Sequence, residues 1–185
     1  MSLRIVAGQW RARKLVAPEG DTTRPTADRT RETLFSMLVS RLGSLDGLAV
    51  ADLFAGSGAL GIEALSRGAA SCIFVEQDPA AIRALRTNIA NLRAQAQCDV
   101  RASSVLSLGP AAAPLDLVLL DPPYRTGAGA VALEKLARLG WFGPASWVSL
   151  ETAADEEPRL RGWEAAADRK VGKARLTLFR PNPGA

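Results

Sequence analysis

The stretch LDLVLLDPPYR, residues 115–125, places an acid, two prolines and a tyrosine directly after an apolar run. Because proline cannot extend a strand ladder, Pro122 and Pro123 predict a rigid turn with Asp121 and Tyr124 close together on either side. The Asp121 carboxylate and the Pro122 carbonyl could accept the N–H groups of an exocyclic amine and turn its lone pair toward an electrophile. Tyr124 offers a ring on which a flipped base can stack. The pattern favours group transfer to the amine of a base over a purely structural turn, which leaves Asp121 unexplained.

A second stretch whose residues could take part in chemistry, residues 52–61, reads DLFAGSGALG. Gly56, Gly58 and Gly61 have the G-x-G-x-x-G spacing that lets a backbone approach a nucleotide-like ligand between a strand and a helix N-terminus. Glu76 ends the next apolar run about 20 residues after the first glycine, where an acid can accept hydrogen bonds from both hydroxyls of a ribose. The sequence therefore predicts a cofactor that contains a nucleoside.

Asp52 distinguishes between two cofactors of this kind, NAD and S-adenosyl-L-methionine. It stands four residues before Gly56 at the end of the preceding apolar run, so its carboxylate would face the cofactor. A pyrophosphate would be repelled there, whereas the amino and sulfonium groups of S-adenosylmethionine would be attracted. We therefore expect S-adenosylmethionine, the alternative being that Asp52 only caps the loop that follows.

Strand-like and helix-like segments alternate along the chain from Leu48 onward, and this alternation predicts the elements that position these residues. Repeated βα units imply a parallel sheet with helices on both faces. Two further β-like runs on either side of residues 171–173 predict a terminal antiparallel hairpin at one edge. We expect an α/β, Rossmann-like, doubly wound domain over residues 46–185, with strands over 48–54, 71–76, 98–102, 115–120 and 146–151 and helices over 57–68, 79–95 and 128–139.

The first 45 residues have the character of an extension. Residues 4–18 have β-rich ends, which predicts a short hairpin, and apolar residues recur at helical spacing over residues 29–42. This segment holds eight Lys or Arg against four Asp or Glu, whereas the remaining 140 residues hold fifteen of each. A basic extension indicates a polyanionic partner, although a solvated basic surface explains the same charges. The candidate contacts are Trp10, Arg11, Arg13, Lys14, Arg24, Arg29 and Arg31.

Composition narrows the chemistry further. The 185 residues contain no histidine, so the usual general base and the commonest metal ligand are missing, and the two cysteines lack metal-ligand spacing. We therefore expect no metal. No apolar run is long enough for a signal peptide or a membrane span, which predicts a cytoplasmic protein, and a monomer is expected.

DPPY combined with DLFAGSGALG resembles the amino-methyltransferases that modify adenine N6, cytosine N4 or guanine N2. Further segments of the chain resemble the RsmD family, which methylates a guanine N2 in small-subunit (16S) ribosomal RNA. These segments are GQWRARKL, RPTADRTRETLF, FAGSGALGIEALSRGA, VEQD and, near the C-terminus, KVG. The resemblance covers nearly the whole chain. It implies a Rossmann-like class I methyltransferase fold with a seven-stranded sheet, an RNA-binding extension over residues 1–45, and action on an assembled or assembling 30S subunit.

The resemblance also assigns roles to individual residues. The amine would be surrounded by residues 121–124, and Glu76 would bind the ribose. Such enzymes often place Asp or Asn after the third strand to bind the adenine amine, but this chain reads RASSV there, so Ser103 or a backbone group would take that role. The remaining cofactor residues would be Asp52, Phe54, Gly56, Ser57 and Gly58.

Three other functions stay open at this point. A DNA adenine-N6 methyltransferase would share DPPY but needs a target-recognition region, for which this chain has little room. An NAD(P)-binding oxidoreductase would need a proton relay such as Tyr with Lys, and none is evident. A non-catalytic RNA-binding module would not need Asp121.

Overall fold

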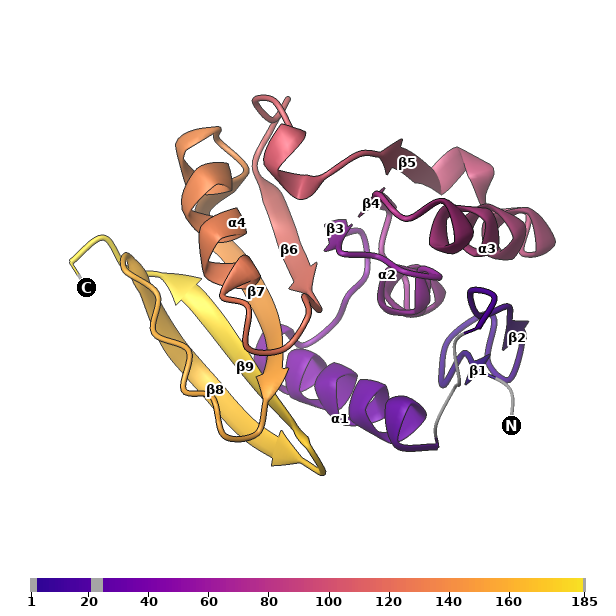
Figure 1. Ribbon diagram of the computed structural model, residues 1–185, viewed down its shortest axis with the longest axis horizontal. Helices are drawn as coiled ribbons and strands as arrows, with labels where there is room; N and C mark the ends of the chain where they lie inside the picture. Colours follow the sequence, from indigo (N-terminus) through magenta and orange to yellow (C-terminus); the bar gives the residue numbers. More distant parts are fainter. Residues whose placement is uncertain (1–2, 21–24, 185) are drawn as a thin grey trace.

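The computed structural model describes residues 3–20 and 25–184, with the side chains of residues 25 and 26 outside the description. A small two-stranded sheet precedes a larger α/β unit (Figure 1). Within these residues no helix is both long and apolar enough to cross a membrane. The elements are β1 (Leu3–Arg4), β2 (Lys14–Leu15), α1 (Pro25–Leu42), β3 (Ala49–Leu53), α2 (Ala59–Ser66), β4 (Ser71–Glu76), α3 (Pro79–Asn91), the 3-10 turn η1 (Gln95–Gln97), β5 (Cys98–Ala102), η2 (Val105–Ser107), β6 (Leu115–Leu120), α4 (Ala128–Arg138), β7 (Phe142–Ala153), β8 (Trp163–Val171) and β9 (Ala174–Pro181).

The main sheet has seven strands in the order β5-β4-β3-β6-β7-β9-β8. The first five are parallel, and β9 and β8 add antiparallel strands at one edge, as the sequence predicts. At the centre of the sheet, residues 117–120 of β6 are almost fully buried, because helices cover both faces of a parallel sheet. One face packs against α1, α2, α3 and the N-terminal hairpin, and the other packs against α4 and η2 (Figure 1).

Two element boundaries differ from the sequence prediction. Helix α1 begins at Pro25 rather than at residue 29, because proline is well suited to the first turn of a helix, where its missing N–H costs nothing. Strand β7 runs over 12 residues rather than the predicted 146–151. Residues 148–153 pair with antiparallel β9, and this pairing carries β7 past the end of its parallel neighbour β6.

The N-terminal extension packs onto the sheet domain. Leu34, Phe35 and Leu38 of α1 are buried in the same core as Ile62 and Phe74 of the βα unit that follows. The predicted hairpin is present as the short antiparallel pair β1–β2. This packing fixes α1 beside the carboxyl ends of the central strands (Figure 1).

Candidate active site

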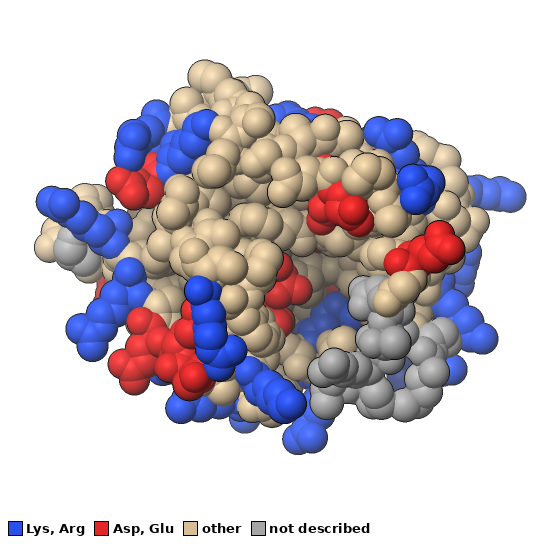
Figure 2. Space-filling model, in the orientation of Figure 1, with Lys and Arg blue, Asp and Glu red and all other residues tan. Residues whose placement is uncertain are grey.

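A cleft of about 770 Å³ lies at the carboxyl ends of β3, β6 and β7. Its other walls are the first turns of α1 and the turn between β8 and β9. Figure 2 shows a hollow near the middle of this face, with acidic side chains in it and Lys and Arg side chains along its lower rim. A doubly wound sheet binds its ligands outside the carboxyl ends of its strands, so this cleft is the candidate site.

The glycine loop between β3 and α2 forms one wall of the cleft. Gly58 has φ +87°, and a Cβ atom there would lie 2.4 Å from the Leu85 side chain. A Cβ on Gly61 would lie 2.4 Å from the Phe74 ring, so this glycine allows α2 to pack closely on β4. Phe54, which lines the cleft, has φ +61°, a conformation uncommon for a residue with a side chain.

Asp52 lies at the bottom of the cleft and is only 1% exposed. Its Oδ2 accepts a hydrogen bond from the Gly61 N–H at 2.9 Å, and its Oδ1 has no hydrogen-bond partner among the described residues. Burial raises the pKa of Asp52 to about 8, against the opposing effect of the Gly61 N–H, and the charge of Glu76 raises it further. A buried acceptor without a partner beside a cleft fits a ligand that brings a cation or a donor.

Glu76 closes the glycine loop from the end of β4. Its Oε1 accepts the Gly56 N–H at 2.8 Å, and its Oε2 accepts the N–H groups of the next two residues, both at 2.9 Å. A carboxylate has lone pairs for further donors, so the predicted ribose contact remains compatible with these bonds. Ser103 follows Ala102, which pairs with Glu76 across β4 and β5, so the two candidate nucleoside contacts lie next to each other.

The DPPY segment follows β6 directly, as the sequence predicts. Asp121 and Tyr124 both line the cleft, and Asp121 is open to it on one side. Withdrawal from bulk water, and then the nearby Glu151 and Asp52, raise the pKa of Asp121 well above its usual range. The Pro123 carbonyl accepts a hydrogen bond from the Thr126 hydroxyl at 2.7 Å, which holds the turn in shape.

Glu151 is a cleft residue that the sequence did not predict. Leu150 pairs with Leu120 across β7 and β6, so Glu151 and Asp121 are the next residues on two adjacent parallel strands. The Tyr124 hydroxyl donates a hydrogen bond to Glu151 Oε2 at 2.6 Å. The signal available in the sequence was weak: an acid near the end of an apolar strand that follows the DPPY unit.

Comparison with known proteins identifies the family. A family model described as conserved hypothetical protein 95 matches residues 3–180. The chain belongs to this family. Its relatives include the ribosomal RNA small subunit methyltransferase D of Escherichia coli, 35% identical over 96% of this chain and 89% of the relative. The protein of the same name from Haemophilus influenzae is 37% identical over 96% of this chain and 93% of the relative. The predicted membership of the RsmD family is thereby confirmed.

Solved structures agree with the fold. The Escherichia coli protein YhhF, described as a candidate methyltransferase, is 31% identical, with a TM-score of 0.84 and 99% of both chains covered. A magnesium protoporphyrin IX methyltransferase from Synechocystis, solved with bound S-adenosylmethionine, is 19% identical and shows likeness of fold, with a TM-score of 0.67 over 88% of this chain and 87% of that one. The predicted Rossmann-like methyltransferase fold is confirmed.

The family match includes the basic N-terminal residues, which the structure separates into two groups. Arg29 is exposed on the first turns of α1 and lines the cleft, where Lys173 faces it from the β8–β9 turn. The hairpin candidates lie elsewhere: Trp10, Arg11, Arg13 and Lys14. Gln9 N donates to Ser66 O at the end of α2, and Arg13 donates to Asn91 O at the end of α3, which are the helix ends remote from the cleft.

The roles of the hairpin residues stay predictions. Arg11, Arg13 and Lys14 are exposed, and Trp10 is half-buried against the core. Helix α2 is 8 residues long. This length separates the hairpin loop from the glycine loop by roughly 12 Å, so hairpin contacts require a ligand that extends along the surface. Arg24 lies outside the described residues.

Arg31, predicted to contact a polyanion, lines the cleft, but its side chain bonds mainly within the protein, so that role stays a prediction. Arg31 is 4% exposed, and its guanidinium donates to the Arg4 carbonyl, to Asp28 at 2.9 Å and to Glu63 at 3.4 Å. Glu63 is fully buried in α2 and also accepts the backbone N–H groups of Val6 and Ala7. Arg31 therefore fastens α1 and the extension to the sheet domain.

Proposed function

We propose that this protein uses S-adenosylmethionine to methylate the exocyclic N2 amine of a guanine in small-subunit (16S) ribosomal RNA. The observation that carries the proposal is the meeting, in one cleft, of Asp121 of the DPPY turn with a buried Asp52 oxygen that has no hydrogen-bond partner in the described part of the chain. Membership of a family with relatives named ribosomal RNA small subunit methyltransferase D supports the choice of substrate.

The cofactor would lie along the glycine loop. Asp52 Oδ1 would accept a hydrogen bond from its amino group or face its sulfonium, and Glu76 would accept the ribose hydroxyls. When bound, S-adenosylmethionine supplies a methyl group on a positively charged sulfur. The remaining contacts would come from Phe54, Gly56, Ser57 and Gly58 in the loop, and from Ser103 beside the adenine.

The DPPY turn would hold the target amine. The Asp121 carboxylate and the Pro122 carbonyl would accept its two N–H protons, which directs the nitrogen lone pair at the methyl group. The amine must lose one proton as it gains the methyl group, and the Asp121–Glu151 pair lies where that proton can be accepted. Tyr124, 38% exposed, presents a ring against which the base can stack, and Pro123 keeps the turn rigid.

RNA would be held by basic residues outside the cleft floor. Arg29 and Lys173 line the cleft from α1 and from the β8–β9 turn and would contact the phosphates that flank the flipped nucleotide. The hairpin residues Trp10, Arg11, Arg13 and Lys14 would contact RNA further along the molecule, so the substrate would be a structured RNA in an assembled or assembling 30S subunit. Residues 1–45 would form the RNA-binding extension and residues 46–185 the methyltransferase domain.

The charge of the cleft floor disfavours the oxidoreductase alternative. Asp52, Asp121 and Glu151 meet there, and a pyrophosphate next to three carboxyl groups would be repelled. A melting-temperature comparison distinguishes the two cofactors directly, because a ligand that binds only the native state stabilises it. The demethylated cofactor product should stabilise the protein and NAD should not.

The substrate is tested by mass mapping of methylated bases. Small subunits from cells that lack the modification would be incubated with the protein and isotopically labelled S-adenosylmethionine, with Asp121→Ala as the control. The proposal expects label in one N2-methylguanosine of the ribosomal RNA and none with the control. Label in adenine N6, in cytosine N4 or in duplex DNA would contradict it.

A further inference from the structure

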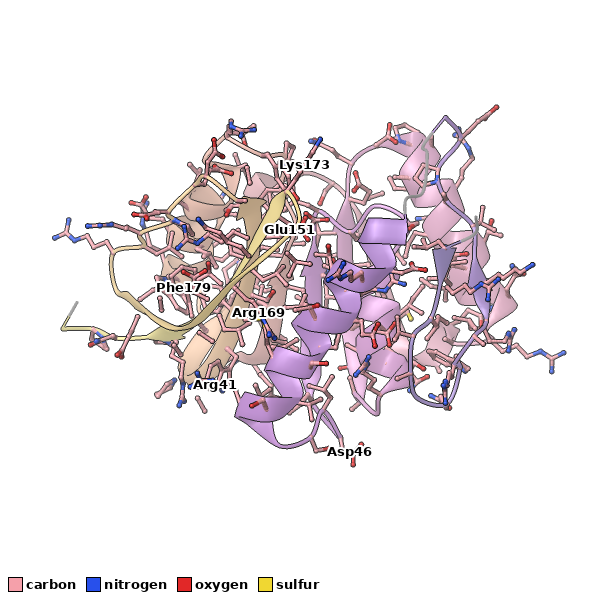
Figure 3. All side chains as sticks on the ribbon, turned by 90° about the horizontal axis from the view of Figure 1, so that it is seen from below. Arg41, Asp46, Glu151, Arg169, Lys173 and Phe179 are labelled. Atoms are coloured by element: carbon pink, nitrogen blue, oxygen red, sulfur yellow. The ribbon has the colours of Figure 1, made fainter. Side chains whose placement is uncertain are left out.

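Glu151 lies next to the proposed amine site, in addition to the acceptors that the DPPY turn itself provides. It follows Leu150, which pairs with Leu120, so its carboxylate lies beside Asp121 at the same edge of the sheet. It lines the cleft together with Asp121 and Tyr124 and is half-buried there. Figure 3 shows Glu151 and Lys173 at the end of the sheet opposite Arg41 and Asp46.

The orientation of Glu151 is fixed by its neighbours. The Tyr124 hydroxyl donates to its Oε2 at 2.6 Å, a short bond of the kind that a carboxylate accepts. Burial raises the pKa of both Asp121 and Glu151; the nearby Glu151 raises that of Asp121 further, whereas the Tyr124 hydroxyl opposes the rise at Glu151. Glu151 therefore presents an acceptor oxygen that Tyr124 holds beside Asp121.

The three bases with an exocyclic amine differ in the ring atom beside that amine. In guanine, N1 carries a hydrogen and is a donor next to N2, whereas adenine N1 and cytosine N3 are acceptors next to their amines. A site built to accept a substrate N–H strongly rejects an analogue that lacks it, because the acceptors of the site and the base then oppose each other. A second fixed acceptor beside the amine-binding Asp121 thus suits guanine and opposes the other two.

We propose that Glu151 is a specificity-determining residue that selects guanine by accepting its N1–H while Asp121 and Pro122 hold the N2 amine. The proposal rests on the proposed methylation of guanine N2 and explains why that base would be chosen. The Tyr124 hydroxyl keeps the Glu151 carboxylate in place while the ring of the same residue stacks on the base. The buried Asp52 Oδ1 in the same cleft, which no residue of 3–20 or 25–184 bonds, independently indicates that a ligand completes this site.

The test compares guanine with 2-aminopurine, which keeps the amine but has an acceptor at N1. Each base would be placed at the modified position in reconstituted small subunits, and kcat/KM would be measured for the wild type and for Glu151→Gln. Loss of a hydrogen bond to a charged group typically lowers the ratio of kcat/KM for guanine to kcat/KM for 2-aminopurine by about 10- to 100-fold. The wild type should therefore prefer guanine strongly, and the preference should fall about tenfold or more in Glu151→Gln, because the glutamine amide can donate to N1.

The control is Tyr124→Phe, which keeps the ring and removes only the hydroxyl. Intrinsic reactivity of the two bases is the same for every variant, so the change in preference, rather than the preference itself, reports on Glu151. Tyr124→Phe should lower activity toward both bases and reduce the preference by less than Glu151→Gln does, because the Glu151 carboxylate is still present but less firmly positioned. An unchanged preference in Glu151→Gln, or an equal change in Tyr124→Phe, would overturn the inference while leaving guanine methylation intact. Absence of guanine methylation by the wild type would overturn both proposals.

Discussion

The floor of the cleft is lined by acidic side chains and its rim by basic ones. The floor consists of Asp52, Asp121 and Glu151, which lie on or directly beyond the strands β3, β6 and β7. The rim presents Arg29 from the surface of α1 and Lys173 from a hairpin turn, both exposed. Figure 3 shows Lys173 at this turn. An acidic floor attracts cations and hydrogen-bond donors and repels phosphate, whereas a basic rim attracts phosphate. The difference suits a reaction in which a base enters the cleft and its backbone stays outside.

The largest effect is expected on stability, at the buried ion pair between Arg31 and Glu63 that attaches α1 to the sheet domain. Glu63→Gln leaves the Arg31 charge without its buried partner and should lower the free energy of unfolding by about 3 to 5 kcal/mol. Urea denaturation measures this change. The matched control is Glu134→Gln in an exposed pair with Arg138, which should change stability by under about 1 kcal/mol. Equal effects of the two variants would show that the Glu63 contacts do not fasten α1.

The second-largest effect is expected on turnover, when Asp121 of the floor is replaced and the basic residues of the rim are kept. Asp121→Ala removes one of the two acceptors proposed to orient the amine, so kcat should fall by about a hundredfold to a thousandfold. The glycine loop is untouched, and affinity for the demethylated cofactor product should change by less than about threefold. Single-turnover kinetics and calorimetry measure the two quantities. A folded variant with near-normal turnover would restrict Asp121 to a structural role.

The third effect concerns Asp52 and pH. Because burial raises the pKa of Asp52 to about 8, the native state binds a proton that the unfolded chain releases near pH 4. The stability of the cofactor-free protein should therefore fall as pH rises between these values, and Asp52→Asn should flatten that dependence. Glu76 and Asp121 both lie near the Asp52 carboxylate.

Ionisation of Asp52 should also change cofactor affinity, which we expect to rise with pH whereas the stability falls. The charged form of Asp52 attracts the cofactor, so affinity should rise from pH 6.5 to pH 9, and Asp52→Asn should weaken it by about 10- to 100-fold at the higher pH. Calorimetry at both values measures this, with Asp99→Asn, in an exposed pair with Arg101, as the control. Equal cofactor affinity of Asp52→Asn and the wild type at pH 9 would contradict the role given to Asp52.

Much of the floor was predictable because its residues stand in short continuous motifs. DLFAGSG and DPPY each join a buried strand to a tight turn, so local sequence alone indicates both the strand end and the exposed functional group. Glu151 was not predictable in this way. It enters the site because β7 lies next to β6, a pairing between segments 30 residues apart that no local pattern reports.

The rim and its support depended still more on tertiary structure. Arg29 and Arg31 are two residues apart and look equally basic, yet one is exposed beside the cleft and the other is buried on Glu63, 32 residues later. Helical periodicity identified α1, but the partner of each charged side chain depends on which helix packs against it. The same reason explains why the sequence alone could not place the hairpin relative to the cleft.

The most direct test of the division between floor and rim is the salt dependence of RNA binding. Removal of one cationic side chain that binds a phosphate should reduce the slope of log affinity against log salt by about 0.7 to 0.9. The double variant Arg29→Ala with Lys173→Ala should therefore have a slope smaller than that of the wild type by about 1.4 to 1.8, whereas Asp121→Ala should keep the wild-type slope, because its partner is a base rather than a phosphate. A rim variant with the wild-type slope, or an Asp121→Ala variant with an altered one, would contradict the assignment of phosphates to the rim and of the base to the floor.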